Sequence, residues 1–184
     1  MEERQLIEGC VRGEQWAQKM MYELYAPTMM SVCQRYVCNR ETARDLLHDG
    51  FIRLFSKMEA YSGKGLFVGW MRRIFVTTAL EHLRRNDIMR YSLELTNIDV
   101  QYEDTDVTAF EHLSADDLLE CVARLPDQYR TVFNMHAIEE YTFVEIAREL
   151  EINENTLRTH YARARQLLQK MVMERVSSLQ IAGV

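Results

Sequence analysis

The protein has 184 residues, of which 47% are hydrophobic, and its 28 acidic and 22 basic side chains give a net charge of −6. This length suits one domain or two small ones, and only two prolines and seven glycines interrupt the chain, which favours long helices over a turn-rich β fold. No apolar run is long enough to span a membrane, and no secretory signal follows the charged N-terminus, so we expect a cytoplasmic protein without membrane insertion.

The charges are unevenly distributed. Residues 64–90 hold six basic and two acidic side chains, residues 91–117 hold eight acids and no Lys or Arg, and residues 155–170 hold four basic side chains and no acid. Two basic segments on either side of an acidic one suggest two nucleic-acid faces on a chain that binds DNA poorly alone.

The first predicted domain covers residues 1–90 and is helical. Pro27 lies between two apolar helical patterns, so we expect it to begin the second. Asn39 is the predicted cap of the next helix, and Ser62-Gly63-Lys64-Gly65 is a predicted break before another. The apolar side of that last helix comprises Phe67, Trp70, Met71, Ile74, Thr78 and His82.

Residues 91–113 are acidic, polar and without periodicity, which predicts a linker. The second predicted domain covers residues 114–184. Capping patterns at Ser114-Asp117 and Thr142-Glu145, and Asn153 before the last helix, mark its helix starts. The expected fold is therefore all-α, with two small helical domains joined by an acidic linker.

Residues 142–170 have the pattern of a helix-turn-helix, with a capped short helix, a tight turn and a longer basic helix. Basic and small side chains on the outer face of the second helix suit the DNA major groove. The predicted DNA contacts there are Asn155, Arg158, Thr159, Ala162, Arg163 and Gln166, with Arg165 at the margin. The alternative interpretation is a basic helix that only faces solvent.

A second basic segment, residues 61–90, combines aromatic and cationic side chains, which suits a separated DNA strand. Its glycine-containing loop can shape a pocket for one unstacked base. The alternative for Phe67 and Trp70, which the periodicity favours, is a place in the core. The predicted contacts are Tyr61, Ser62, Gly63, Lys64, Gly65, Arg72, Arg73, Thr77, Arg84 and Arg85.

The chain shows no HExxH, P-loop or GxSxG pattern, so an enzyme is the least expected class. Its four cysteines form no CxxC pair and have no histidine at zinc-finger spacing, which predicts buried or neutral thiols and no metal site. We expect no cofactor and no small-molecule substrate. His48, Asp49, Ile52 and Arg53 lie off the apolar stripe of helix 41–58, where Ile52 hints at a protein contact and a solvated face is the default.

The order of the segments resembles an extracytoplasmic-function sigma factor of the sigma-70 family. Strings similar to that family's domain 2 are Leu24-Tyr25-Ala26-Pro27-Thr28-Met29, Asp45-Leu46-Leu47-His48-Asp49-Gly50-Phe51 and Gly69-Trp70-Met71-Arg72-Arg73-Ile74. Strings similar to its domain 4 are Leu125-Pro126-Asp127-Gln128-Tyr129-Arg130, Ile146-Ala147, Thr156-Leu157-Arg158 and Arg163-Ala164-Arg165.

The resemblance implies that the chain binds core RNA polymerase and promoter DNA, with an anti-sigma factor as a further partner. The loop 61–66 then captures a flipped base of the −10 element, helix 67–88 contacts the upstream part of that element, and helix 154–170 reads the −35 element. The residues that the resemblance places on the polymerase clamp helices are Asp45, His48, Asp49, Ile52 and Arg53.

The sequence departs from the family at three places. Thr77 replaces a common Asn, Glu151 replaces the usual Gly of the helix-turn-helix, and His48-Asp49 replaces Gln-Glu. Two other functions therefore stay open: a stand-alone helix-turn-helix regulator, and a sigma-like protein that has lost initiation.

Overall fold

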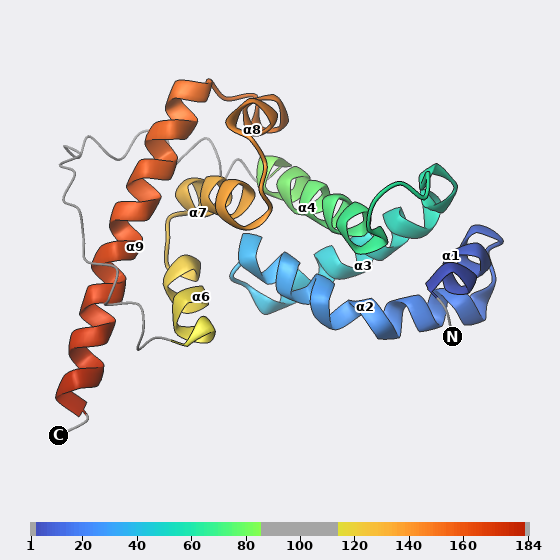
Figure 1. The fold of residues 1–184 in the computed structure, drawn as a ribbon, viewed down its shortest axis with the longest axis horizontal. Coiled ribbons are helices and arrows are strands. Elements are labelled where there is room, and N and C mark those ends of the chain that lie inside the picture. The colour runs from blue at the N-terminus through green and yellow to red at the C-terminus, as the bar shows by residue number, and fades with distance from the viewer. Residues whose placement is uncertain (1–2, 86–113, 183–184) are drawn as a thin grey trace. The chain divides into compact units, whose positions relative to one another are not determined.

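A computed structural model describes residues 3–85 and 114–182, and the chain divides into two compact units, Met1–Arg85 and Asn86–Val184 (Figure 1). Every regular element in these two described ranges is helical, which confirms the all-α fold. The predicted linker, residues 91–113, lies outside the described residues.

The first unit contains α1 (Glu3–Val11), α2 (Gln15–Tyr36), α3 (Arg40–Ser56), the 3-10 turn η1 (Met58–Ala60) and α4 (Phe67–Arg85). Helix α2 packs against α1, α3 and α4, so it is the centre of this unit. The largest fully buried side chains here are Tyr36, Phe67, Phe75, Met21, Met29, Leu54, Met58, Met71, Leu80 and Leu83.

Pro27 does not begin a helix, which corrects the expectation from the sequence. It lies inside the continuous 22-residue helix α2. Proline has no backbone N–H, so α2 lacks the hydrogen bond from residue 27 to the carbonyl of Glu23. Pro27 and Glu23 both lie on the exposed side, where water can solvate that carbonyl, and the buried side chains on the opposite side hold the helix together.

At Gly50, α3 lies directly against a side chain of α4. A Cβ atom added to Gly50 would lie 2.3 Å from the Phe75 ring, which no structure tolerates without a shift. The Phe75 ring also packs edge-on against Phe51, with ring centroids 5.2 Å apart. The missing side chain of Gly50 therefore allows the two helices to pack in direct contact.

The second unit contains α6 (Ala115–Ala123), α7 (Asp127–Phe133), the π-helical turn η4 (Asn134–Ile138), α8 (Phe143–Leu150) and α9 (Glu154–Ala182). Helix α9 packs against α6, α7 and α8. It is longer than the helix that the sequence indicated, because its regular structure continues past residue 170. One cluster of its core comprises Leu125, Tyr129 and Ala164, with Phe133, Leu167, Leu168 and Met171 packed around them.

The helix starts predicted at Asn39, Ser114 and Thr142 are confirmed. The Asn39 side chain accepts hydrogen bonds from the backbone of Glu41 and Thr42, at 2.9 and 3.0 Å. Both capping boxes, Ser114-Asp117 and Thr142-Glu145, are complete. Each such box satisfies two backbone donors that a helix end would otherwise leave unpaired.

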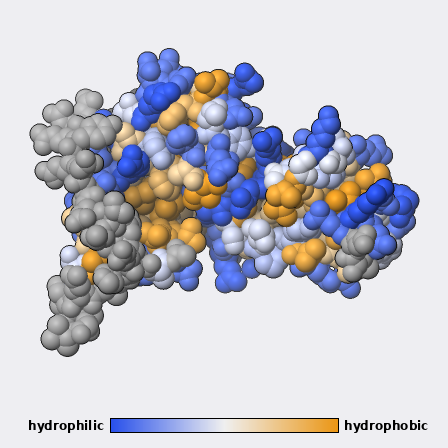
Figure 2. Space-filling model, in the orientation of Figure 1, coloured by the Kyte–Doolittle hydropathy of each residue, from blue (hydrophilic) through white to orange (hydrophobic). Residues whose placement is uncertain are grey.

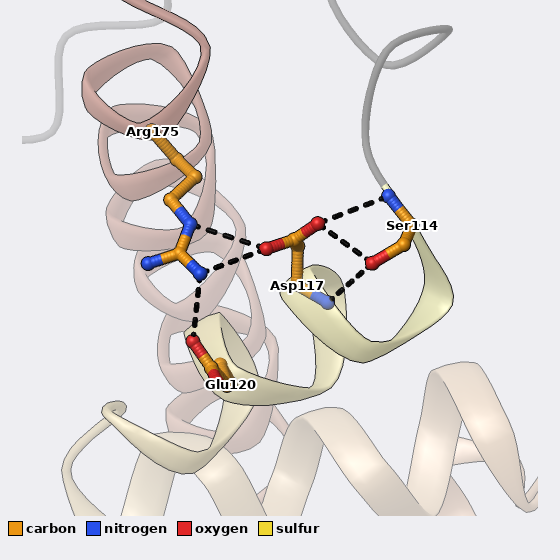
Figure 3. A network of polar contacts seen from close by, with 4 residues as sticks. All are labelled: Ser114, Asp117, Glu120 and Arg175. Atoms are coloured by element: carbon orange, nitrogen blue, oxygen red, sulfur yellow. Dashed lines mark hydrogen bonds and ion pairs between the residues drawn. The ribbon is translucent and has the colours of Figure 1, made fainter. Parts of the chain in front are cut away.

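Asp117 also joins the first helix described in the second unit, α6, to the last one, α9. Its carboxylate accepts hydrogen bonds from the Ser114 backbone and from Arg175 of α9, the latter at 2.8 Å, and Arg175 also binds Glu120 at 3.0 Å (Figure 3). The bonds from Ser114 and then from Arg175 hold the pKa of Asp117 below its usual value. This network fixes the start of α6 to the far half of α9.

Three of the four cysteines, Cys10, Cys33 and Cys121, are buried, whereas Cys38 is exposed. Burial raises the pKa of Cys10 to about 11 and that of Cys33 to about 12, so both stay neutral thiols. In the part of the chain that the structure describes, no cluster of His, Cys, Asp and Glu has the arrangement of a metal site. None of the helices described is long and apolar enough to cross a membrane.

Candidate nucleic-acid interface

The helix-turn-helix is formed by α8 and α9. Ile146 and Leu150 of α8 and Leu157 of α9 are buried, so the two helices share an apolar contact. Glu151 ends α8 in the left-handed region, at φ 56° and ψ 36°. This is the position at which the family usually has Gly, and a side chain there is strained, as expected from the sequence. The Asn153 side chain accepts a hydrogen bond of 2.8 Å from the Asn155 backbone and caps α9.

Arg158 is exposed and held in place. Its guanidinium lies 2.5 Å from Oε1 of Glu154, one turn earlier, and 4.7 Å from the centre of the Phe143 ring of α8. The ion pair and the cation–π contact fix the guanidinium at the junction of the two helices. Sequence reasoning missed Glu154 and Phe143, although the spacing of Glu154 and Arg158 is a readable signal for an ion pair.

The other predicted −35 residues fall into two groups. The exposed residues are Asn155, Thr159 and Arg165, and the partly buried residues are Ala162, Arg163 and Gln166. Thr159 donates its hydroxyl hydrogen bond to the Asn155 carbonyl at 3.0 Å. The outer face of α9 therefore carries two exposed arginines, Arg158 and Arg165, beside short side chains.

Arg163 does not point outward as the sequence suggested. Its Nη1 donates a 3.3 Å hydrogen bond to the hydroxyl of Tyr129 on α7, and the side chain is partly buried. His160 packs edge-on against the same Tyr129 ring, with centroids 5.4 Å apart. Burial, and then the charge of Arg163, lower the pKa of His160, so the core holds a neutral imidazole. Arg163 lies at the margin of the helix, where the neighbouring helix decides its direction.

In the first unit, the predicted base-binding loop is built on an aromatic cluster. Gly63 and Gly65 have φ of 72° and 77°, a region that favours glycine. The Tyr61 hydroxyl donates to the Gly65 carbonyl at 3.0 Å, and its ring lies 5.1 Å from that of Phe67 and 5.2 Å from that of Trp70. Phe67 is buried, as the periodicity favoured, while Trp70 is partly exposed. The loop is therefore held by the cluster of the Tyr61, Phe67 and Trp70 rings.

The cationic side chains of α4 and its preceding loop are mostly accessible. Lys64, Arg73, Arg84 and Arg85 are exposed, and Arg72 is partly buried. Thr77 is partly buried, and its hydroxyl donates to the Arg73 carbonyl at 2.8 Å. No acidic residue occurs from Ala60 to Leu80, so this surface favours a polyanion.

The residues that the resemblance assigns to polymerase differ in how accessible they are. Asp45, His48, Asp49 and Ile52 are exposed, and Ile52 keeps 66% of its surface accessible. Arg53 is instead partly buried and forms a 2.6 Å ion pair with Glu81 of α4. Figure 2 shows hydrophobic residues exposed at several places on a mainly hydrophilic surface.

Two family models match this chain in the order that the two units have. The Sigma-70 region 2 model matches residues 21–88, and the Sigma-70 region 4 model matches residues 115–168. The chain belongs to the sigma-70 family, as an extracytoplasmic-function factor. Region 2 thus includes most of α2 with α3, the aromatic loop and α4, and region 4 includes the helix-turn-helix.

Two relatives cover nearly all of this sigma-70 chain. The ECF RNA polymerase sigma-E factor of Haemophilus influenzae is 24% identical over 177 residues, which are 91% of this chain and 93% of that protein. The ECF RNA polymerase sigma factor SigW of Bacillus subtilis is 24% identical over 184 aligned positions, which cover 91% of this chain and 95% of that protein.

Two solved structures share the fold. The sigma factor RpoE of Bartonella quintana, in complex with the anti-sigma factor NepR, has a TM-score of 0.52 and 15% identity over 84% of this chain and 96% of that chain. CnrH, in complex with the cytosolic domain of CnrY, has a TM-score of 0.50 and 17% identity over 94% of this chain and 97% of that chain. At these identities the likeness concerns the fold alone.

Proposed function

We propose that this sigma-70 family protein binds core RNA polymerase, directs it to promoters with −35 and −10 elements, and promotes DNA opening there. The observation that carries this proposal is the presence of region 2 and region 4 in one chain, each with an accessible basic helix surface. The net charge of −6 supports a protein that acts on DNA only together with polymerase.

The −35 element is assigned to α9. Arg158 and Arg165 supply exposed donors for guanine edges or phosphates, and the small side chains of Thr159 and Ala162 leave room for close approach. Asn155 and Gln166 supply amide groups on the same outer side. Arg163 acts at the margin of this surface, from its position on Tyr129.

The −10 element is assigned to the loop 61–66 and to α4. Lys64 and the α4 arginines neutralise phosphates, and the open loop with Gly63 and Gly65 offers space for one unstacked base. Thr77 lies where the family commonly has Asn, so base preference at this element differs from that of members with Asn.

The polymerase surface is assigned to the exposed side of α3. Asp45, His48 and Asp49 are exposed on the turns of α3 before Ile52, and an exposed isoleucine beside polar groups is typical of a protein contact. Arg53 contributes by fixing α3 to α4. We infer a non-enzymatic protein that acts in the cytoplasm with polymerase. We also infer that it binds an anti-sigma factor, since the similar sigma factor RpoE is in complex with the anti-sigma factor NepR.

The test is transcription with purified core polymerase on a genomic promoter library. We expect run-off products only when this protein is added, and we expect the protein to bind core polymerase in a pull-down. Absence of polymerase binding would overturn the proposal. Specific duplex binding without polymerase would favour a stand-alone regulator, and polymerase binding without transcripts would favour a sigma-like protein that has lost initiation.

A further inference from the structure

The guanidinium group of Arg158 on α9 has one edge occupied by a carboxylate. Its Nε and Nη2 both donate hydrogen bonds to Oε1 of Glu154, at 3.2 and 2.5 Å. These two nitrogens form one edge of the planar group, and Nη1 and Nη2 form another. That second edge meets no acceptor in the described parts of the chain, so its donors are available to a group outside the protein.

One face of the same guanidinium group lies on an aromatic ring. The Cζ atom of Arg158 is 4.7 Å from the centre of the Phe143 ring. Phe143 is itself held, because its ring stacks on His136 with centroids 4.2 Å apart and packs edge-on against Tyr161 at 5.8 Å. The His136 ring is fixed in turn, since its Nδ1 lies 2.8 Å from the Tyr141 carbonyl oxygen. Arg158 is therefore supported by a ring that cannot turn without moving its neighbours.

Glu154 lies at the start of α9. It is the first residue of that helix, where the helix dipole favours a negative charge. Its side chain is 38% exposed and that of Arg158 is 58% exposed, so a ligand can reach the pair from outside. The carboxylate and the guanidinium group neutralise each other. This part of α9 therefore offers hydrogen-bond donors without a net positive charge.

The ligand that fits these donors is a guanine base. A phosphate is attracted by positive charge, and the Glu154 carboxylate cancels the charge of Arg158 and repels an anion beside it. The major-groove edge of guanine is uncharged, and its O6 and N7 are two neighbouring acceptors that a pair of guanidinium donors matches. A guanidinium group that is already oriented also loses less conformational freedom when it forms these bonds.

We propose that Glu154 and Phe143 are positioning residues that direct Arg158 to a guanine of the −35 element and keep it from binding phosphates. These roles rest on the proposed function in initiation, and they add two residues that act through Arg158. Removal of the Glu154 charge should make promoter binding tighter and less selective, because Arg158 can then bind phosphates. A residue that only stabilised α9 would have the opposite effect, since its loss would weaken binding to every sequence.

The experiment uses holoenzyme reconstituted from core polymerase and full-length protein, on a promoter selected with the wild-type holoenzyme. Equilibrium binding is measured on this promoter and on variants in which each −35 guanine, on either strand, is replaced by the other bases. For the wild type we expect a preference of about tenfold or more for one guanine. For Glu154→Gln we expect this preference to fall about threefold or more, and the slope of log affinity against log salt concentration to steepen by about 0.9, the value for one added phosphate contact.

Phe143 is tested by two substitutions. Phe143→Leu removes the ring face under Arg158 and should also lower the guanine preference, whereas Phe143→Tyr keeps that face and should retain the preference. Amide exchange in α8 and α9 shows whether each variant is folded. Because both residues act through Arg158, neither Glu154→Gln nor Phe143→Leu should change the remaining selectivity of an Arg158→Ala variant. A change there would overturn the positioning role of that residue.

Glu140→Gln is the matched control, because it removes the same charge from an exposed residue of the second unit. It should leave the guanine preference at the wild-type value. An unchanged preference in Glu154→Gln, or equal weakening of its binding to all −35 variants, would overturn the positioning role and leave the proposed function intact. Failure of the wild-type holoenzyme to select any promoter would instead overturn the proposed function, and the positioning role with it.

Discussion

Arg53 of α3 and Glu81 of α4 form an ion pair in which Nη2 and Oε2 lie 2.6 Å apart, and both side chains are about one third exposed. The pair joins the helix assigned to polymerase to the helix assigned to the −10 element. The Arg53 hydrogen bond lowers the pKa of Glu81, so the carboxylate is charged in the folded protein at neutral pH.

A double-mutant cycle of Arg53→Ala and Glu81→Ala should give a coupling free energy of about 0.5–1 kcal/mol, as for other partly exposed pairs. Tryptophan fluorescence can measure it, because both tryptophans, Trp16 and Trp70, lie in the first unit. The folded pKa of Glu81 is lowered, so the coupling is present above the pKa of an unfolded glutamate and disappears as the pH falls through the folded value. A coupling that persists in acid would contradict this assignment.

Arg158→Ala and Arg163→Ala should fail in different ways. Arg158 is exposed, so its loss should cost about 1–3 kcal/mol of base discrimination at the −35 element with little change in stability. Arg163 binds Tyr129, so its loss should lower amide exchange protection in α7 and α9 more than it lowers promoter selection.

Tyr129→Phe is the control for Arg163, since it removes the hydroxyl and keeps the ring. It should reproduce the loss of exchange protection and leave −35 selectivity intact. If Arg163→Ala abolished −35 recognition and left exchange unchanged, Arg163 would act on DNA directly, and its contact with Tyr129 would not stabilise the unit.

Glu151→Gly should stabilise the second unit by about 1 kcal/mol, because glycine adopts the left-handed conformation without steric cost. Glu151→Ala should bring no such gain, since alanine keeps the Cβ atom that causes the strain. Hydrogen exchange at the amides of α8 measures the difference within the intact chain. Equal stability of the two variants would show that Glu151 is not strained.

Asp117 should make the start of α6 sensitive to acid. Its folded pKa is lowered by Ser114 and Arg175, so its contribution is present above the usual aspartate range and is lost as the pH falls through the folded value. Exchange protection in α6 should therefore drop in acid for the wild type. The Asp117→Asn variant should show lower exchange protection in α6 at neutral pH, and this protection should change little as the pH falls. The Asp116→Asn variant, which changes an exposed residue of the same turn, should follow the wild type.

The features that the sequence predicted well are local. Asn39, Thr142 and Glu145 bind backbone within three residues of themselves, so their spacing is sufficient to recognise a helix start. The strained turn at Glu151 was expected from the family resemblance, which places Gly at this position after α8.

The features that the sequence did not predict depend on distant neighbours. Arg53 and Arg163 lie at helix margins, where Glu81 and Tyr129 on other helices determine the direction of each guanidinium. Pro27 was predicted to begin a helix but lies inside α2. A proline is tolerated inside a helix when it lies on the exposed side, and the packing of the other helices decides which side that is.

The absent side chain at Gly50 has a mechanical consequence. The Phe75 ring fills the space that a Cβ atom of Gly50 would occupy, so no room for a side chain is left between α3 and α4 at this point. Any residue other than glycine at position 50 would therefore displace the Phe75 ring and, with it, the packing of the whole first unit.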